Sequence, residues 1–354
     1  MNAKKVIIDC DPGIDDALAL MLALSAPGLE ILGITVVSGN VPAQTGSENA
    51  LKVLDWMNRS DIPVYTGERL PLVRPYVDAM DTHGRDGLGE SGYPPVILIK
   101  PKDDAVSFLA QTLRSTDQVS VIALGPLTNL ARLFQTDPDA FGRIDELVSM
   151  GGCYKSHGNC SPVAEYNYWC DPHAARIVYE AFSTLPALAE KKIHMVGLDV
   201  TRQIVLTPNL LEYIRLLQPD TGRRITEITR FYFDFHWKQE GVIGCVINDP
   251  LAVAYFLDRS LCTGFDTYTT IETEGLCIGQ SVSDAFDFWH KPANSHILTD
   301  TDPLRFWKFF LTHLLHGKEP DIEPVLRQIL TAPCPETVPA CSGSVPRFFE
   351  RSSL

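Results

Sequence analysis

Short apolar runs and segments with helical spacing alternate along most of the chain. Each apolar run is rich in β-branched residues, which is typical of buried strands, and the segment after it repeats apolar residues three or four positions apart. The predicted strands span residues 6–8, 31–37, 63–67, 119–124, 144–150 and 193–200, and the predicted helices span 17–24, 46–58, 106–113, 173–182, 210–217 and 303–315. Because strands that alternate with helices favour a parallel sheet, we expect an α/β fold: a single domain with an open, mostly parallel, doubly wound (Rossmann-like) sheet.

Three segments depart from this alternation. Residues 69–102 show no clear periodicity, and a loop of that length inside a compact domain is usually functional or disordered. Residues 227–237 are rich in aromatic side chains, which are mostly typical of a core but could in part stack on a flat ring. Residues 265–301 predict further strands. We therefore expect a domain over residues 1–316, followed by a C-terminal part, 317–354, made of a short amphipathic helix over 322–330 and a loose tail.

The end of the first predicted strand is unusually acidic. Within eight residues the sequence places four carboxylates: Asp9, Asp11, Asp15 and Asp16. Pro12 cannot donate to a sheet ladder and Gly13 permits backbone angles that other residues avoid, so the chain must turn between these carboxylates. In open α/β sheets, ligands bind at the carboxyl ends of the strands. We therefore expect the functional site at that edge.

Several carboxylates in one small turn need an explanation, because they repel one another unless a cation lies between them. Oxygen is the only ligand type offered, so the turn favours a hard divalent cation, Ca²⁺ or Mg²⁺. Two alternatives are an acidic capping turn exposed to solvent and a phosphatase with an aspartyl nucleophile. The phosphatase would need a small or hydroxyl residue pair after the second Asp and a later Gly-Asp metal loop, and the sequence contains neither.

Polar residues also follow the later predicted strands and would reach the same edge of the sheet. Asn40 follows the second strand, and the segment 158–172 mixes amides, a carboxylate and aromatic side chains. A helix cap is enough to explain Asp171 and, taken alone, Asp249. Caps do not explain the other polar residues of the 158–172 segment: Asn159, Glu165 and Asn167.

Composition narrows the classes of function. With 45% hydrophobic and 21% charged residues among 354, the chain has the composition of an ordinary soluble protein. A net charge of −14 without any basic run argues against a nucleic-acid partner, and no apolar stretch is long enough to span a membrane. We also expect no signal peptide, because the first strand begins almost at once. The nine cysteines show neither zinc-ligand spacing nor a disulfide pattern, so we expect reduced thiols in a cytoplasmic protein that binds a small molecule.

Four sequence blocks together resemble one known family. The chain is similar to the nucleoside hydrolases, the inosine–uridine-preferring N-ribohydrolase family, over roughly residues 5–315. The blocks that carry the resemblance are Asp9–Ala17, Gly125–Asn129, Met150–Gly152 and Pro162–Asn167. The resemblance implies Ca²⁺-dependent hydrolysis of the N-glycosidic bond of ribonucleosides to free base and ribose, in nucleoside salvage. It also implies a homodimer or homotetramer.

The resemblance also assigns roles to individual residues. It implies that Ca²⁺ is held by the backbone carbonyl of Leu124 and by three carboxylates, Asp11, Asp16 and Asp249. Asp11 would take a proton from the attacking water. The ribose hydroxyls would be held by Asp15, Asn40 and Asn167 on the 2′ and 3′ side and by Asn159 and Glu165 on the 5′ side. Met150 and Tyr166 would line the sugar pocket, and His83 would lie near the ligand in a mobile loop, although a lone His in a long loop is otherwise an exposed bystander.

Asn248 departs from the family pattern. Members that protonate the leaving base often carry His-Asp-Pro where this chain has Asn248-Asp249-Pro250, and an amide cannot deliver a proton. Asn248 can still hydrogen-bond a base or a 5′-hydroxyl, so we keep it with Asp11, Asn40 and His83 among the candidate catalytic residues. Three hypotheses remain. Another group protonates the base, namely His83, His236 or Tyr232; or the substrate is a modified or unusual nucleoside; or the protein binds nucleosides or ribose without turnover.

Overall fold

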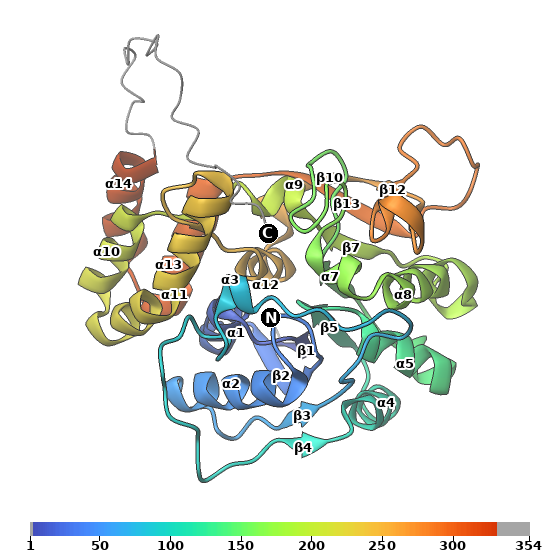
Figure 1. Cartoon of the computed structure of the whole chain (residues 1–354), viewed down its shortest axis with the longest axis horizontal. Helices are drawn as coiled ribbons and strands as arrows, with labels where there is room; N and C mark the ends of the chain where they lie inside the picture. The colour runs from blue at the N-terminus through green and yellow to red at the C-terminus, as the bar shows by residue number, and fades with distance from the viewer. Residues whose placement is uncertain (1–2, 331–354) are drawn as a thin grey trace, which may run out of the picture.

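The computed structural model describes residues 3–330 of the chain. A nine-stranded sheet forms its centre (Figure 1). Its strand order is β10-β13-β7-β6-β5-β1-β2-β3-β4, and neighbouring strands are parallel except for β10, which is antiparallel to β13 at one edge. The strands are β1 (Lys4–Cys10), β2 (Leu29–Val36), β3 (Val64–Thr66), β4 (Lys102–Asp103), β5 (Val119–Ala123), β6 (Leu147–Met150), β7 (Ile193–Val196), β10 (Cys262–Thr267) and β13 (Ser295–Thr301). The predicted open, mostly parallel sheet is confirmed.

Helices cover both faces of the sheet, as expected for a doubly wound fold (Figure 1). Along β1, Val6 and Ile8 point into one apolar core while Ile7 points into the other, because successive side chains of a strand face opposite ways. The first core is closed by α1 (Ile14–Ser25), α2 (Ala43–Trp56), α10 (Pro208–Leu217), α11 (Pro219–Glu240), α12 (Asp249–Leu257) and α13 (Pro303–Leu315). The second is closed by α4 (Ala105–Ser115), α5 (Thr128–Thr136), α6 (Pro138–Phe141) and α8 (Pro172–Thr184).

The remaining elements are short. They are α3 (Met80–His83), α7 (Tyr166–Cys170), α9 (Leu198–Thr201), α14 (Glu319–Leu330), the 3₁₀ turns η1 (Pro186–Leu188), η2 (Arg259–Leu261) and η3 (Gly275–Cys277), and two small antiparallel pairs. The pairs are formed by β8 (Val205–Leu206) with β9 (Cys245–Val246) and by β11 (Thr269–Ile271) with β12 (Ser281–Ser283).

Several element boundaries differ from the prediction. The strand expected over 193–200 ends at Val196, and the apolar run continues into α9, because a short apolar run alone does not separate strand from helix. The strand expected over 144–150 begins at Leu147. The aromatic segment 227–237 is part of the 22-residue helix α11. The segment 69–102 contains the single turn α3, and its last residue begins the short strand β4.

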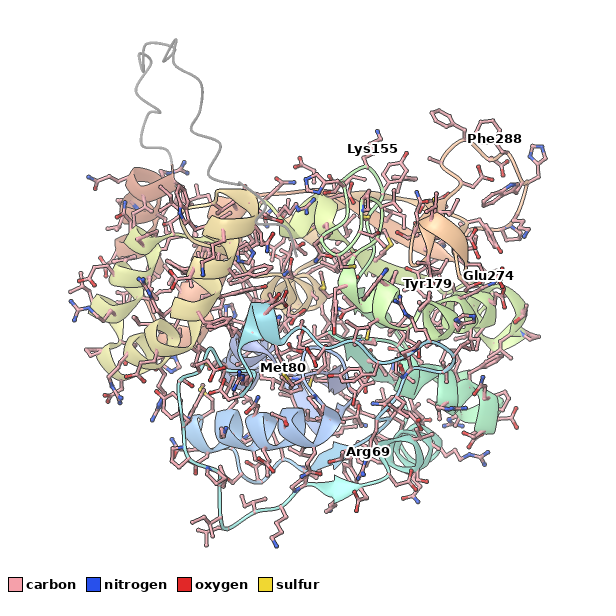
Figure 2. All side chains as sticks on the ribbon, in the orientation of Figure 1. Arg69, Met80, Lys155, Tyr179, Glu274 and Phe288 are labelled. Carbon is pink, nitrogen blue, oxygen red and sulfur yellow. The ribbon has the colours of Figure 1, made fainter. Side chains whose placement is uncertain are left out.

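The C-terminal part is described as far as residue 330. α14 packs beside α13, with Ile322 and Leu326 buried, so this predicted helix is present. The predicted loose tail lies outside the described residues, and the boundary at residue 316 stays a prediction. Between β12 and β13 a loop projects from the body and carries Phe288 (Figure 2). Within residues 3–330, no helix combines the length and apolar character needed to cross a membrane.

The register of the sheet aligns the strand ends that carry the predicted site. Asp9 of β1 lies opposite Thr35 of β2 and Ala123 of β5, and Ala123 lies opposite Ser149 of β6. The residues that follow these positions therefore meet at one edge of the sheet: Asp11, Asn40, Leu124 and Met150.

Candidate active site

Asp11 lies just beyond β1 and is completely buried. The backbone N–H of Asn40 donates to its Oδ2 at 2.7 Å, whereas its Oδ1 has no hydrogen-bond partner among the described residues. Gly39 and Gly125 allow the neighbouring loops to approach: a Cβ on Gly39 would lie 1.9 Å from Asp11 Oδ2, and one on Gly125 would lie 2.5 Å from Oδ1. The sheet edge thus encloses one carboxylate with an unsatisfied oxygen.

Three further carboxylates gather beside Asp11. Asp15 and Asp16 lie in the first turn of α1, and Asp249 is the first residue of α12. Each of the three carboxylates has an oxygen that lies within 4.8 Å of an oxygen of both others. Asp16 accepts the backbone N–H groups of Asp11 at 3.2 Å and Gly13 at 2.9 Å, so the acidic turn wraps around its carboxylate. This geometric cluster contains Asp15, whereas the resemblance implies Asp11 as the third carboxylate ligand.

Burial raises the pKa of these carboxyl groups. The pKa of Asp16 rises to about 7, first because the group is desolvated and then because of the charge on Asp15. Burial and the neighbouring carboxylates also raise the pKa values of Asp11 and Asp249 well above the usual range. The alternative of a solvent-exposed capping turn is therefore wrong. Such a cluster is unfavourable without a cation, and the carboxylates, the unpaired Asp11 Oδ1 and the nearby Leu124 carbonyl form an oxygen donor set that fits a hard divalent ion.

Glu165 and Asn167 form the facing wall. Glu165 caps α7 through its Oε1, which accepts the backbone N–H of Asn167 at 2.8 Å, so the expectation that no helix cap explains this residue is wrong. Its Oε2 accepts the backbone N–H of Gly152 at 2.8 Å. Burial raises the pKa of Glu165 to about 7. Asn167 Nδ2 donates to the carbonyl oxygens of Leu124 at 2.7 Å and Met150 at 3.1 Å, so its position is set by the ends of β5 and β6.

Tyr166 connects this wall to the long segment 69–102. Its hydroxyl oxygen lies 2.7 Å from the carbonyl of Gly39 and 2.8 Å from that of Val77. The hydroxyl of Tyr76 donates to the same Gly39 carbonyl at 2.9 Å. The segment without periodicity is therefore attached to the loop that presses on Asp11.

His83 is buried, so its interpretation as an exposed bystander is wrong. Its Nδ1 accepts the backbone N–H of Ile14, the first residue of α1, at 3.0 Å. Asn49 reinforces the attachment, since its Nδ2 donates to the carbonyls of Pro12 at 3.1 Å and Asp86 at 2.7 Å. These contacts fix His83 against the acidic turn.

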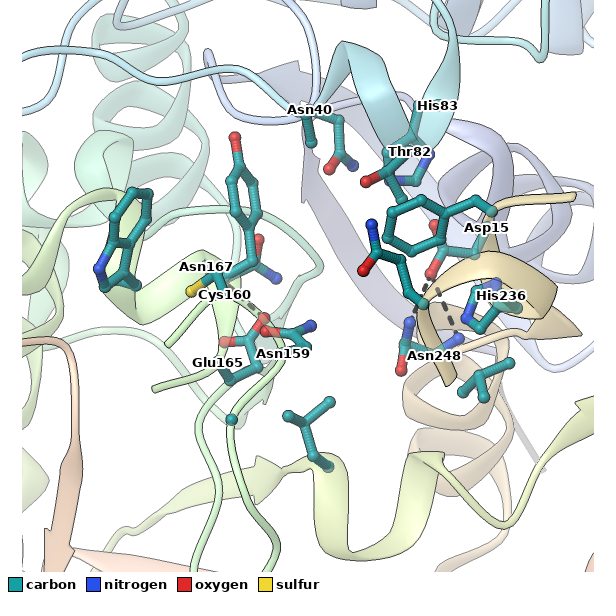
Figure 3. A pocket seen from close by; sticks show the side chains of 18 of the residues that line it. Asp15, Asn40, Thr82, His83, Asn159, Cys160, Glu165, Asn167, His236 and Asn248 are labelled. Atoms are coloured by element: carbon teal, nitrogen blue, oxygen red, sulfur yellow. Dashed lines mark hydrogen bonds between the residues drawn. The ribbon is translucent and has the colours of Figure 1, made fainter. Parts of the chain in front are cut away.

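Asn248 and α11 form the remaining wall. The Nδ2 of Asn248 donates to Asp15 Oδ2 at 3.0 Å and its backbone N–H to the same oxygen at 3.2 Å, while its Oδ1 is buried without a hydrogen-bond partner in the described chain. From α11, Tyr232, Phe235 and His236 line the same cavity. Figure 3 shows His236 near Asn248. The amide that replaces the family histidine therefore holds Asp15 and presents an unpaired acceptor.

These walls enclose a cavity of about 540 Å³, a size suited to a small molecule (Figure 3). Asp11 and Asp16 are fully buried beside these residues, and all the other predicted site residues line the cavity: Asp15, Asn40, His83, Leu124, Met150, Asn159, Glu165, Tyr166, Asn167, Asn248 and Asp249. The structure thus brings the whole predicted set together at one edge of the sheet.

Some lining residues have no signal in the sequence. Arg202, after α9, donates to the carbonyls of His157 at 2.7 Å and Gly158 at 3.1 Å and pairs with Glu240 of α11 at 3.4 Å. It thereby holds the loop that carries Asn159 against the end of α11. Only the fold reveals these contacts, because the partners of Arg202 lie about 40 residues before and after it in the sequence.

A deep acidic site beside an amide-lined cavity, at the carboxyl ends of a doubly wound sheet, defines a small-molecule enzyme of the α/β class. The family model described as "Inosine-uridine preferring nucleoside hydrolase" matches residues 6–308. The chain therefore belongs to the nucleoside hydrolase family, whose members are N-ribohydrolases.

Individual relatives agree with this assignment. The pyrimidine-specific ribonucleoside hydrolase RihA of Shewanella sp. (strain ANA-3) is 36% identical over 85% of this chain and 92% of its own length. Uridine nucleosidase 1 of Arabidopsis thaliana is 34% identical, over 79% and 82%. Among solved structures, the plant nucleoside hydrolase PpNRh1 matches with a TM-score of 0.81 at 31% identity, over 89% of this chain and 99% of its own. The purine-preferring ribonucleoside hydrolase from Gardnerella vaginalis also has a TM-score of 0.81, at 29% identity, over 88% and 98%.

Proposed function

We propose that this protein hydrolyses the N-glycosidic bond of ribonucleosides with the help of Ca²⁺, releasing free base and ribose for nucleoside salvage. The observation that carries the proposal is the buried Asp11, whose Oδ1 has no partner among the described residues, beside three further carboxylates at the floor of the cavity. A cytoplasmic location and a homodimer or homotetramer stay predictions.

The residues present fit a calcium ion. Asp11, Asp16, Asp249 and the Leu124 carbonyl would hold it, and their oxygen-only donor set matches the preference of Ca²⁺. When bound, the ion would lower the pKa of a coordinated water and neutralise the carboxylate cluster. The oxygen of Asp11 that has no partner among the described residues would then take the proton of the attacking water.

The walls of the cavity would position the sugar. Asp15, Asn40 and Asn167 would hold the 2′- and 3′-hydroxyls over the carboxylates, and Asn159 and Glu165 would hold the 5′-hydroxyl. Breaking the bond to the base builds positive charge on the ribose ring, as in other glycoside hydrolysis. The anionic floor of the cavity would stabilise that charge.

A panel of substrates tests the proposal. Purified protein with Ca²⁺ is given inosine, adenosine, guanosine, uridine, cytidine, several modified nucleosides and p-nitrophenyl riboside, and ribose release is measured. We expect turnover of at least one common ribonucleoside. Turnover of only one modified nucleoside would favour the second candidate, a hydrolase for an unusual nucleoside, which the unpaired Asn248 Oδ1 supports. Nucleoside binding without release of base from any substrate would replace both with a binding protein.

Asn248→His is expected to change the order in which the nucleosides of the panel are preferred. The substitution replaces an unpaired amide acceptor at the cavity wall with an imidazole. We expect the ratio of kcat/KM between two bases to shift by roughly 10-fold or more, which corresponds to one hydrogen bond. Asn248→Gln, which keeps both the acceptor oxygen and the donating NH₂ group of an amide, is the matched comparison. An unchanged order in Asn248→His would mean that residue 248 does not face the base.

A further inference from the structure

Because residue 248 is an asparagine and not a histidine, a proton for the departing base must come from another group. The answer suggested by the structure rests on the function proposed above. Three groups that line the same cavity as Asn248 carry a proton that could be transferred: His83, Tyr232 and His236. Figure 3 shows His83 and His236 in this cavity. Their rings adjoin one another, with centroids 5.2 Å apart for His83 and Tyr232 and 4.4 Å apart for Tyr232 and His236. Their hydrogen bonds distinguish them.

His83 is held in its neutral form. Its Nδ1 accepts the backbone N–H of Ile14, so the ring proton must lie on Nε2. Protonating Nδ1 would break that bond and place a positive charge at the N-terminus of α1, where the helix dipole opposes it. Burial lowers the pKa of His83 as well. His83 can donate a hydrogen bond to a ligand, but it cannot cycle between its two charge states without losing its attachment.

His236 has the opposite arrangement. Its Nδ1 donates to the carbonyl oxygen of Tyr232, one helical turn earlier in α11, at 3.0 Å. Its Nε2 takes part in no hydrogen bond among the described residues, and the side chain lines the cavity. The bond to Tyr232 is the same in both charge states of the ring. His236 can therefore gain and lose a proton at Nε2 with no change in its position.

Tyr232 is a poor proton donor. Burial, followed by the charge on Asp15, raises the pKa of its hydroxyl well above 10. The hydroxyl oxygen also lies 3.5 Å from Asp15 Oδ2, at the limit of a hydrogen bond, so it faces the sugar side of the cavity. Tyr232 orients His236 through its carbonyl instead.

We propose that His236 is the general acid of this protein and delivers the proton of Nε2 to the leaving base. In that step the bond between C1′ and the base nitrogen breaks and its electron pair goes to the base, which takes the proton from Nε2. The attacking water adds its hydroxyl to C1′ and gives its other proton to Asp11. His236 then regains a proton from solvent and Asp11 releases its proton to solvent, so the net reaction consumes one water.

The charges around His236 set its pH dependence. Glu240 on the same helix and Asp15 on α1 favour the imidazolium form, whereas Arg202 opposes it. His83, which is held neutral, adds no charge. Burial is the largest effect, and the pKa of His236 lies below the ordinary value of 6.5. The protonated fraction falls as the pH rises through this pKa, so kcat/KM for a nucleoside should fall with it.

The test compares His236→Gln with His313→Gln on two classes of substrate. His313 of α13 makes the same bond one turn back, from Nδ1 to the carbonyl of Phe309 at 2.9 Å, but lies outside the cavity, so it is a matched control. We expect His236→Gln to lower kcat on the best common nucleoside by ~10²–10³-fold. Its turnover of p-nitrophenyl riboside, whose leaving group needs no proton, should stay within about 3-fold of wild type. The fall of kcat/KM with rising pH should disappear in this variant.

Each other outcome overturns the proposal. Full nucleoside turnover by His236→Gln would show that another group is the acid. An equal loss on both substrate classes, with His313→Gln unaffected, would show that His236 only positions the site. Failure of wild type to hydrolyse any nucleoside or the activated riboside would instead refute the proposed function itself. Circular dichroism and the melting temperature of each variant identify a variant that has failed to fold, and His236→Asn then takes its place.

Discussion

Asp11→Asn is expected to lower kcat by ~10³–10⁴-fold on every substrate of the panel, because it would remove both the proposed base for the water proton and a proposed ligand of the ion. The substitution is conservative in shape. An asparagine can still accept the backbone N–H of Asn40 through its amide oxygen, and its NH₂ group would occupy the place of the unpaired Oδ1. Steady-state rates of ribose release measure the effect.

The loss should include p-nitrophenyl riboside, which distinguishes Asp11→Asn from His236→Gln. Asp171→Asn is a matched control, since Asp171 is equally buried but lies outside the cluster. It caps α8 and accepts the backbone N–H of Leu72 at 2.9 Å and the hydroxyl of Thr128 at 2.8 Å. We expect that control to lose stability while kcat changes by no more than a few-fold. Asp11→Asn turnover within 10-fold of wild type would exclude Asp11 as the general base.

Local sequence signals were sufficient to predict the acidic half of the site. A β-branched strand, a Pro12-Gly13 turn and an apolar helix follow one another directly, so the position of Asp11 at a strand end depends on neighbours in the sequence alone. Asn40, Leu124 and Met150 follow predicted strands in the same way. Because parallel strands share one carboxyl edge, predicting the strands was enough to bring these residues together.

The base-facing half could not be predicted in this way, because its geometry depends on distant contacts. The position of His83 depends on its hydrogen bond with the backbone N–H of Ile14, which is 69 residues away in the sequence. Nothing in the segment 69–102 indicates that partner. His236 is different, since its partner Tyr232 is four residues away on the same helix. The sequence does not predict that bond, because the mixed polar and aromatic composition of α11 gives no clear sign of a helix of 22 residues.

This division has a physical basis. The carboxylates are useful only when several point at one ion, and a short turn achieves this with little help from the rest of the fold. Base recognition instead needs side chains that stand over the ribose from another direction. In the proposed function α3, α11 and the start of α12 would supply them, and these segments, far apart in the sequence, are brought together only by the fold.

Removal of divalent ions with a chelator is expected to lower ribose release by at least ~10²-fold and to lower the melting temperature, and added Ca²⁺ should restore both. Without the ion, buried carboxylates whose pKa values are raised by burial and mutual repulsion destabilise the folded chain at neutral pH. Ca²⁺ at 100 times its Kd would stabilise the folded state by about 2.7 kcal/mol. Thermal unfolding with and without Ca²⁺ measures this shift independently of activity.

Asp249→Asn sharpens the experiment. It removes one carboxylate from the cluster but keeps the shape of the side chain, so the chelated variant should melt at a higher temperature than chelated wild type and should gain less from Ca²⁺. Asp171→Asn, whose carboxylate lies outside the cluster, should respond to Ca²⁺ as wild type does. A chelated wild type that keeps its rate, or a melting temperature that Ca²⁺ does not change, would rule out the carboxylate cluster as a calcium site.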